Sequence, residues 1–452
     1  MMKNYLKSAA VAVVGAVALV LASGSAGLAQ RGAPLTSTTF PTTLVTGTLA
    51  DSTAYTLAKP EMWNGTVLVD LDSLGMNADY SNWLYAHGVA RVGITRLNVG
   101  SLMDKAAADM VEALDIFTAR FGKPTRPIVW GNSLGGQAAV VAAQRYPDRF
   151  VAALPHCGGL MGWSAYLNTN FDVAYVLKTL LDPASDLPLV HIPDNDAALN
   201  ARWTALIENA QKTPQGRARI ALAAAVGQAP VWTVASQPEP ALDDAVAREE
   251  ATYRTVLDFS RQFTGLRRRL ETPAGGATSW NTGVNYAQLF EKADATDRRT
   301  VTELYKQAGL SLDDDFKAIA KAPRIAPEAG PLEYVHKMYP FDGHITMPMM
   351  GMNSTGDPYV WSAVDSGFKA AVQRVGRQDL LRLTYVHSAG HCAFSGAERV
   401  ATFQVMLERL DTGHWPDTSA AALNARAAAV NFGAQRFWDH VPNSLQRAAQ
   451  KP

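Results

Sequence analysis

The chain has 452 residues, of which 48% are hydrophobic and 18% charged, with 41 basic and 41 acidic side chains. This composition supports a buried core of ordinary size and excludes extensive disorder. The zero formal net charge and the absence of a basic stripe argue against a nucleic-acid partner.

The first residues have the pattern of an export signal. Lys3 and Lys7 precede an apolar run over residues 9–22, and small residues follow it. This pattern predicts a signal peptide over residues 1–29 that is cleaved after Ala29, and therefore a secreted or periplasmic protein. The run is short for a membrane-spanning helix, and no cysteine lies near the cleavage site, so we expect no membrane anchor.

Strand and helix patterns alternate from residue 44 to residue 155. Ser101 and Asp104 have capping-box spacing and predict the start of a long amphipathic helix that ends near Phe121. Alternating strands and helices imply parallel βαβ units, so we predict an α/β protein with a doubly wound, mostly parallel sheet. The predicted elements are a hairpin (44–58), a strand (66–71), a helix (80–87), a strand (89–95), a helix (101–121), a strand (128–130), a helix ending near 146 and a strand (151–155).

The alternation stops between residues 158 and 340. The patterns over residues 171–181 and 196–227 predict helices, and a Pro/Gly-rich stretch predicts an exposed loop over residues 270–285. The basic run Arg267–Arg269 predicts a solvated helix face. We therefore predict that residues 158–340 form a large helical insertion, a cap or lid, between two parts of a core formed by residues 30–157 and 341–452.

The alternation resumes after this helical insertion. Residues 345–352 predict a strand, a polar loop over 353–358 follows, and then a helix over 359–375. A further strand over 380–386 leads into His387-Ser388-Ala389-Gly390-His391-Cys392, and a helix over 396–410 closes the core. The tail after Trp415 is Ala-rich and predicts helix.

The sequence around Ser133 predicts a strand, a sharp turn and a helix. Ile128–Trp130 run into Gly131-Asn132-Ser133-Leu134-Gly135, a G-x-S-x-G pattern, and an Ala/Val-rich helix follows. Glycines on both flanks let strand and helix approach without Cβ clashes. The serine hydroxyl would be exposed at the carboxyl end of the strand, and the Leu134 amide at the helix start could stabilise developing negative charge.

Two later loops supply an acid and a base. Asp357 follows one predicted strand and His391 follows the last, and open α/β sheets place such residues together with Ser133 at the carboxyl edge. His387, four residues before His391, is the second candidate base. Asp365 is a weaker rival to Asp357, which could also be only a turn residue before Pro358.

The order Ser, Asp, His resembles that of the α/β-hydrolases, and the chain resembles a secreted serine hydrolase of that superfamily over residues 44–412. The Gly-Asn-Ser-Leu-Gly elbow, the Gly-Asp-Pro turn and the Gly-His-Cys turn carry the resemblance. It implies an α/β-hydrolase fold with a cap, and cleavage of carboxylic esters through an acyl-enzyme on Ser133. His391 would move the proton, and Asp357 would orient the imidazole. We expect no cofactor and no metal.

The second donor of the oxyanion hole departs from the His-Gly pattern of many relatives. This chain has Asp72-Ser73-Leu74-Gly75 after its third predicted strand. Because the donor is a backbone amide, we expect Ser73 or Leu74 to serve together with Leu134.

The two cysteines, Cys157 and Cys392, each follow a histidine and a predicted strand end. A disulfide between them would tie the His391 loop to the loop after the fourth parallel strand, and an exported protein permits it. Two buried free thiols are the alternative.

The expected substrate is a small-molecule or oligomeric ester. One alternative is an exopeptidase with the same triad, similar to capped prolyl and tripeptidyl aminopeptidases. It would need an anchor for a terminal ammonium, for which Glu249–Glu250 is the obvious acidic pair, although a solvated helix face explains the pair as well. Another alternative is a binding protein that kept the fold without catalysis.

Overall fold

The computed structural model describes residues 40–73, 76–96, 103–339 and 341–447, except for the side chains of residues 163 and 164. The predicted signal peptide and the capping residue Ser101 lie outside these ranges. Within them, no helix is both long enough and apolar enough to span a bilayer.

The described strands form one nine-stranded sheet in the order β1-β2-β4-β3-β5-β6-β7-β8-β9. Strands β3 to β8 run parallel to one another, whereas β1, β2 and β9 pair antiparallel with their neighbours. The strands are β1 (Thr42–Thr48), β2 (Ala54–Pro60), β3 (Thr66–Leu71), β4 (Ala90–Thr95), β5 (Arg126–Asn132), β6 (Ala152–His156), β7 (Met349–Gly356), β8 (Leu381–Ala389) and β9 (Phe437–Trp438). This topology confirms the α/β-hydrolase fold.

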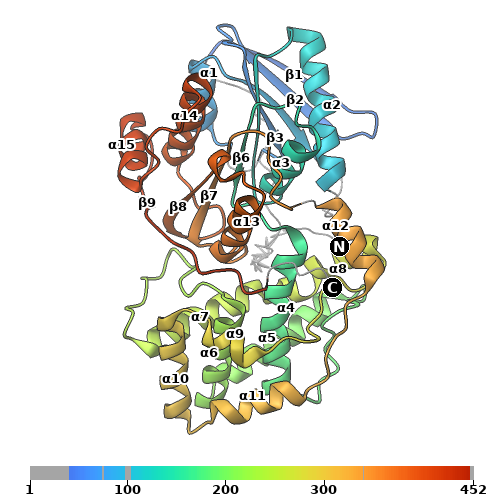
Figure 1. Ribbon diagram of the computed structural model, residues 1–452, viewed down its shortest axis with the longest axis vertical. Coiled ribbons are helices and arrows are strands. Elements are labelled where there is room, and N and C mark those ends of the chain that lie inside the picture. Colours follow the sequence, from blue (N-terminus) through green and yellow to red (C-terminus); the bar gives the residue numbers. More distant parts are fainter. Residues whose placement is uncertain (1–39, 74–75, 97–102, 340, 448–452) are drawn as a thin grey trace, which may run out of the picture. The chain divides into compact units, whose positions relative to one another are not determined.

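Helices cover both faces of the sheet (Figure 1). Val67 and Val69 of β3 pack in a core with α2 and α3, and Leu68 between them packs in the opposite core with α1, α14 and α15. Apolar residues of the sheet therefore face the helices on both sides, which explains why the buried strands are almost continuous hydrophobic runs. These helices are α1 (Ala78–Ala86), α2 (Met103–Phe121), α3 (Leu134–Arg145), α13 (Ser362–Arg374), α14 (Gly396–Thr412) and α15 (Ala420–Val430).

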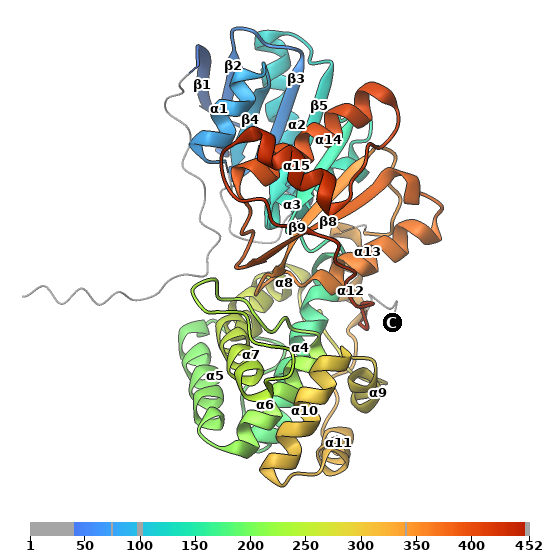
Figure 2. The ribbon, with the colours of Figure 1, turned by 90° about the vertical axis from the view of Figure 1, so that its left-hand side faces the viewer.

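Between β6 and β7 the described chain is helical, and these helices gather at one end of the sheet (Figures 1 and 2). They have a hydrophobic core of their own, which includes Phe171, Trp203 and Phe259. The chain after β9 returns to them, and Arg447 forms a buried ion pair of 2.8 Å with Asp172. The helices are α4 (Gly162–Leu181), α5 (Asp196–Gln211), α6 (Pro214–Gly227), α7 (Ala245–Phe259), η1 (Ser260–Phe263), α8 (Gly265–Ala274), α9 (Tyr286–Glu291), α10 (Ala295–Ala308), α11 (Leu312–Lys321) and α12 (Ala329–Met338).

The segment predicted to be helical over 196–227 is helical and forms two helices, α5 and α6, because Thr213 caps the second through the Gly216 amide and Pro214 occupies its first turn. Two other local predictions in the helical insertion were wrong. The loop predicted over 270–285 starts inside α8, and its residues 277–281 are buried. Arg267 is buried rather than solvated, because its guanidinium donates to Ser279 Oγ and to the Leu167 carbonyl.

Strand β7 also differs from the prediction. It begins at Met349 and continues to Gly356, through residues that the polar sequence assigned to a loop. Asn353 and Ser354 are buried there because their side chains are hydrogen-bonded, Asn353 to Asp365 Oδ2 and Ser354 to the Ala393 amide.

Candidate active site

Ser133 lies in the turn between β5 and α3, with φ 56° and ψ −124°. A positive φ costs a non-glycine residue about 1–3 kcal/mol and persists only where the surroundings enforce it. Here the packing is tight: a Cβ on Gly136 would lie 2.7 Å from the His156 carbonyl oxygen and 2.9 Å from the Gly158 Cα. The turn places the hydroxyl at the carboxyl end of β5, beside the N-terminus of α3.

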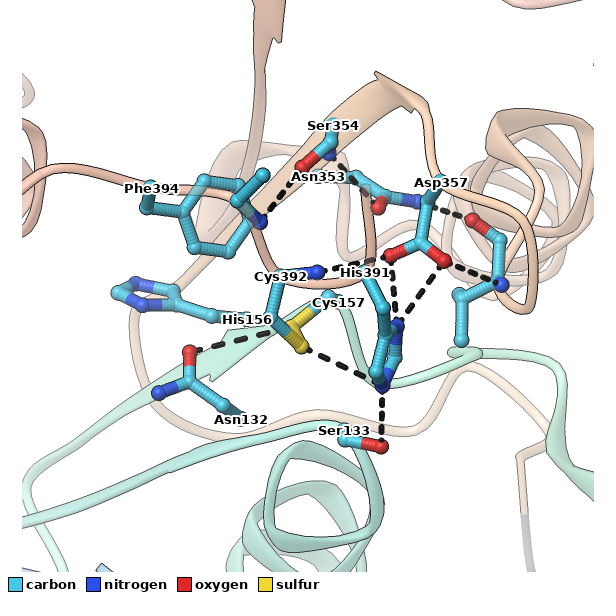
Figure 3. Close-up of a disulfide and its surroundings, with 12 residues drawn as sticks. Asn132, Ser133, His156, Cys157, Asn353, Ser354, Asp357, His391, Cys392 and Phe394 are labelled. Carbon is cyan, nitrogen blue, oxygen red and sulfur yellow. Dashed lines mark hydrogen bonds and ion pairs between the residues drawn. A yellow bond between two sulfur atoms is a disulfide. The ribbon is translucent and has the colours of Figure 1, made fainter. Parts of the chain in front are cut away.

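His391 connects the serine to the acid (Figure 3). Its Nε2 lies 2.8 Å from Ser133 Oγ, and its Nδ1 lies 2.9 and 2.8 Å from the two oxygens of Asp357. When Nδ1 donates to the carboxylate, Nε2 is left as the acceptor for the serine hydroxyl. The structure thus brings together the three residues that the sequence proposed as a triad.

Asp357 is buried and accepts several backbone hydrogen bonds. The amides of Tyr359 and Val360 donate to Oδ1 at 2.8 and 3.0 Å, and the Cys392 amide donates to Oδ2 at 3.1 Å. These donors satisfy the carboxylate and fix its direction. These backbone donors could not be predicted from the sequence, because they depend on how the loop folds.

The predicted disulfide forms between Cys157 and Cys392, whose Cα atoms are 5.5 Å apart. It joins the loop after β6 to the loop after β8, and Cys392 Sγ lies 3.5 Å from His391 Nε2 (Figure 3). The disulfide therefore lies next to the Nε2 edge of the imidazole.

The donors predicted for the oxyanion hole differ in their surroundings. Leu134 is the first residue of α3, and the first amides of a helix have no acceptor within it. The Ser73 amide, in contrast, already donates to Asp70 Oδ1 at 3.0 Å in a buried position. It is therefore not available as a donor in this arrangement. Leu74 lies outside the described residues.

The rival candidates lie in other environments. His387 is paired through Nε2 with Glu239 of the helical insertion, at 2.9 Å. Asp365 lies on α13, where it accepts from Asn353, and burial raises its pKa to about 7. Neither contacts Ser133 in any described interaction.

Tyr359 is a site residue that the sequence analysis missed. Its ring meets the His391 imidazole edge to face, with 5.2 Å between centroids, and its hydroxyl lies 3.2 Å from Arg261 Nη2. Burial raises its pKa. Tyr359 thus links the imidazole to the helical insertion.

A cavity of about 260 Å³ lies between the helical insertion and the β7–β9 end of the sheet. Its lining includes Thr355, Gly356, Trp232, His387 and Trp438, but neither Ser133 nor His391. The candidate active site is therefore defined by the hydrogen bonds that join Ser133, His391 and Asp357, and not by this cavity.

Asp357, His391 and Cys392 place three potential ligand atoms within 4.8 Å of one another. The Cys392 sulfur is bonded to Cys157, however, and only a thiolate would be a strong metal ligand. The cluster is better explained as part of the Ser–His–Asp arrangement.

Several solved structures are similar to the chain at a low level. They include feruloyl esterase B from Aspergillus oryzae (12% identity, TM-score 0.39, 85% of this chain and 83% of that chain). A mutant of a rice cell wall degrading esterase from Xanthomonas oryzae is 13% identical, with a TM-score of 0.37 over 81% of this chain and 89% of that one. An acylaminoacyl peptidase from Pyrococcus horikoshii is 10% identical, with a TM-score of 0.39 over 85% of this chain and 44% of that one. Likeness at this level carries no information about activity.

Sequence comparison gives a nearer relative. No protein-family model matches the chain. An o-phthalyl amidase from Xanthobacter agilis is 30% identical over 418 residues, which cover 86% of this chain and 92% of the relative. Together with the sheet topology, this similarity over nearly the whole length shows that the chain belongs to the hydrolase family that includes o-phthalyl amidase, within the α/β-hydrolase superfamily.

Proposed function

We propose that the protein is a serine hydrolase that transfers the acyl group of a carboxylic amide or ester to Ser133 and then to water. The observation that carries this proposal is the continuous contact from Ser133 Oγ through the His391 imidazole to Asp357. A serine hydroxyl is a weak nucleophile, and a base at hydrogen-bond distance removes that limitation.

In each step of the proposed reaction, one proton moves to or from His391. His391 Nε2 accepts the Ser133 proton as Oγ bonds to the carbonyl carbon, and the carbonyl oxygen becomes an oxyanion next to the Leu134 amide. His391 then donates the proton to the leaving amine or alcohol as the carbon–heteroatom bond breaks. Water repeats the sequence on the acyl-enzyme and releases the acid. Asp357 holds the imidazole and stabilises its cationic form.

For the substrate, we propose amides of an aromatic acid of the o-phthalyl type, and the corresponding monoesters. The similarity to o-phthalyl amidase supports this choice. The sequence alone favoured an ester. An alkoxide leaves more readily than an amine, so an enzyme that cleaves such an amide should also accept an ester of the same acyl group.

The two glutamates that the exopeptidase alternative would need as an ammonium anchor, Glu249 and Glu250, are already paired with arginines. Glu249 is buried and paired with Arg217 at 2.6 Å, and burial raises its pKa to about 7. Glu250 is paired with Arg254 at 2.9 Å. Neither carboxylate is a free anchor. The hydrogen-bond contact between Ser133 and His391 argues against the alternative of a binding protein without catalytic activity.

We also propose that the protein is exported. The sequence pattern over residues 1–29 supports this, and a disulfide is typical of proteins in oxidising compartments. N-terminal sequencing of the protein recovered from the periplasm or medium tests it, and an intact residue 1 on the exported protein would count against cleavage after Ala29.

A labelling experiment tests the central claim. A fluorophosphonate probe should label the wild type and leave Ser133→Ala unlabelled, whereas equal labelling of both would exclude Ser133 as the nucleophile. A substrate panel then separates the classes: an o-phthalyl amide, its monoester, an acetyl ester and an aminoacyl anilide. We expect the o-phthalyl compounds to turn over fastest, and faster turnover of the anilide would favour the exopeptidase.

A further inference from the structure

The cavity at the β7–β9 end of the sheet is bordered by aromatic rings that the proposed reaction does not use. Trp438 of β9 and His387 of β8 have ring centroids 4.5 Å apart, and Trp438 is stacked on His440 at 5.3 Å. Trp232, from the loop between α6 and α7, lies 5.5 Å from the His387 ring. All four residues line the cavity. Two indoles from distant parts of the chain therefore border one hollow.

Glu239 gives this group of rings a negative charge. Its carboxylate lies 2.9 Å from His387 Nε2, while His387 Nδ1 is buried and has no hydrogen-bond partner among the residues described. A proton on Nδ1 would lack an acceptor, which costs free energy in a buried position, so the neutral imidazole that donates from Nε2 is favoured. Burial also lowers the pKa of His440. The two imidazoles therefore leave the charge of Glu239 uncompensated.

The other charged side chains of the lining are already stabilised within the fold. Arg248 and Asp297 form an ion pair of 2.6 Å. Asp294 caps α10, where its Oδ1 accepts the amides of Thr296 and Asp297 at 2.7 and 3.4 Å and the helix dipole offsets its charge. Glu239 is thus the charge of the lining that remains for a ligand, and its side chain is 49% exposed.

Apolar surface at this cavity is open to solvent. Trp438 and Val441 both line the cavity, and they are 41% and 88% exposed. Apolar surface in contact with water favours any ligand that covers it. The cavity volume of about 260 Å³ lies just below the range of pockets for drug-sized molecules, so the ligand should be small.

We propose that this cavity is a second binding site, separate from Ser133, for a small organic cation such as a quaternary ammonium group with an apolar substituent. The positive group lies against the indoles of Trp232 and Trp438, whose π electrons attract a cation, and next to the Glu239 carboxylate. The apolar substituent covers the exposed surface of Val441. An anion of the same size is disfavoured, because Glu239 repels it. The inference does not depend on the proposed acyl transfer.

Benzyltrimethylammonium is a suitable probe, with benzyl alcohol and benzoate as its neutral and anionic counterparts. In isothermal titration calorimetry of the full-length protein, the cation should bind saturably to one site with a Kd on the order of 1 mM, because the cavity is small. Benzyl alcohol should bind at least about tenfold more weakly, since it lacks the charge that the rings and Glu239 attract. Equal affinity for the cation and the alcohol, tighter binding of benzoate, or no binding of the cation would overturn the proposal.

Two substitutions in the lining locate the binding. Trp438→Leu keeps an apolar side chain but removes the indole, and Glu239→Gln removes the charge but keeps an oxygen that can accept from His387. Each should weaken binding of the cation at least about threefold while the Tm stays near that of the wild type. Trp415→Leu is the matched control, because Trp415 packs against Arg382 and Arg409 and does not line the cavity. Wild-type affinity in both lining variants would overturn the proposal.

Blocking Ser133 tests whether the two sites are separate. The fluorophosphonate-labelled enzyme and the Ser133→Ala variant should both bind benzyltrimethylammonium with the Kd of the wild type. Loss of binding in the labelled enzyme would place the cation at Ser133 and overturn the proposal. A wild type that does not react with the fluorophosphonate would contradict the proposed function instead, and titration of the lining variants would still test the cation site.

Discussion

Gly131 and Gly135 are in direct contact across the turn that contains Ser133: a Cβ on Gly131 would lie 2.3 Å from the Gly135 carbonyl carbon. Real Cβ atoms do not approach backbone this closely, and backbone cannot move aside as a flexible side chain can. The contact explains why the motif has glycine on both flanks of the serine. It also gives a direct test of the turn.

Gly131→Ala should lower kcat at least 100-fold and slow fluorophosphonate labelling, because the strand and helix must separate and carry Ser133 Oγ away from His391 Nε2. Gly330→Ala in α12 is the control, since a Cβ there meets nothing within 4 Å. Steady-state kinetics on a monoester measures the effect. A Gly131→Ala enzyme with wild-type kcat would mean that the turn is less rigid than its packing indicates.

Asp357→Asn and Asp365→Asn distinguish the two candidate acids. Asp357→Asn should lower kcat about 10⁴-fold, the effect known for this change in a serine protease triad, because an amide cannot support the required imidazole tautomer. Asp365→Asn should stay within tenfold, since its partner is Asn353. The reverse ranking would assign the acid to Asp365.

The raised pKa of Asp365 predicts how the stability of the folded protein depends on pH. Burial raises its pKa from 3.8 to about 7, so between these values the folded protein keeps a proton that the unfolded chain has released. Rising pH therefore removes stability across this window, by on the order of 4 kcal/mol in total at 1.36 kcal/mol per pKa unit. Urea unfolding from pH 4 to pH 8 should show this loss in the wild type and a smaller loss in Asp365→Asn. Parallel curves for the two proteins would contradict it.

Replacing Cys157 and Cys392 by serine should reduce both stability and activity. In the loop-entropy model, a crosslink between residues 235 apart is worth about 5 kcal/mol, and Cys392 adjoins His391. We expect a lower Tm and a kcat reduced about tenfold. Reduction of the wild type by a thiol should reproduce both effects, and reoxidation should reverse them. An unchanged kcat would show that the Asp357 contacts alone position the imidazole.

The sheet could be predicted from the sequence because each buried strand is a short apolar run between turn residues. Parallel strands also end at one edge of the sheet, so the positions of Ser133, Asp357 and His391 after three such strands predict that they lie together. Their catalytic roles stay predictions until the variants are measured. The pairing of Cys157 with Cys392 followed from the same edge argument, with free thiols as the alternative.

Contacts that depend on tertiary packing could not be predicted. Nothing local distinguishes Arg267, whose buried guanidinium donates to Ser279, from its more exposed neighbours. Glu249 is likewise buried in contact with Arg217 and Gln211 of other helices, which its own sequence does not indicate. One signal was overlooked: Asp70 and Arg91 are charged residues inside otherwise apolar strands. A buried charge needs a buried partner of opposite charge, so this rule predicts that Asp70 and Arg91 form a pair, as they do in the structure.

The ion pair between Arg447 and Asp172 has a consequence for how substrate reaches Ser133. The helical insertion is joined to the sheet by its two ends and by the contacts of Glu239 with His387 and of Arg261 with Tyr359. The ion pair adds an attachment that is made by the C-terminal segment. With these attachments the insertion is not free to rotate about a single hinge, so we expect substrate to enter through smaller rearrangements of side chains and loops, and we expect truncation before Arg447 to weaken the packing of the insertion.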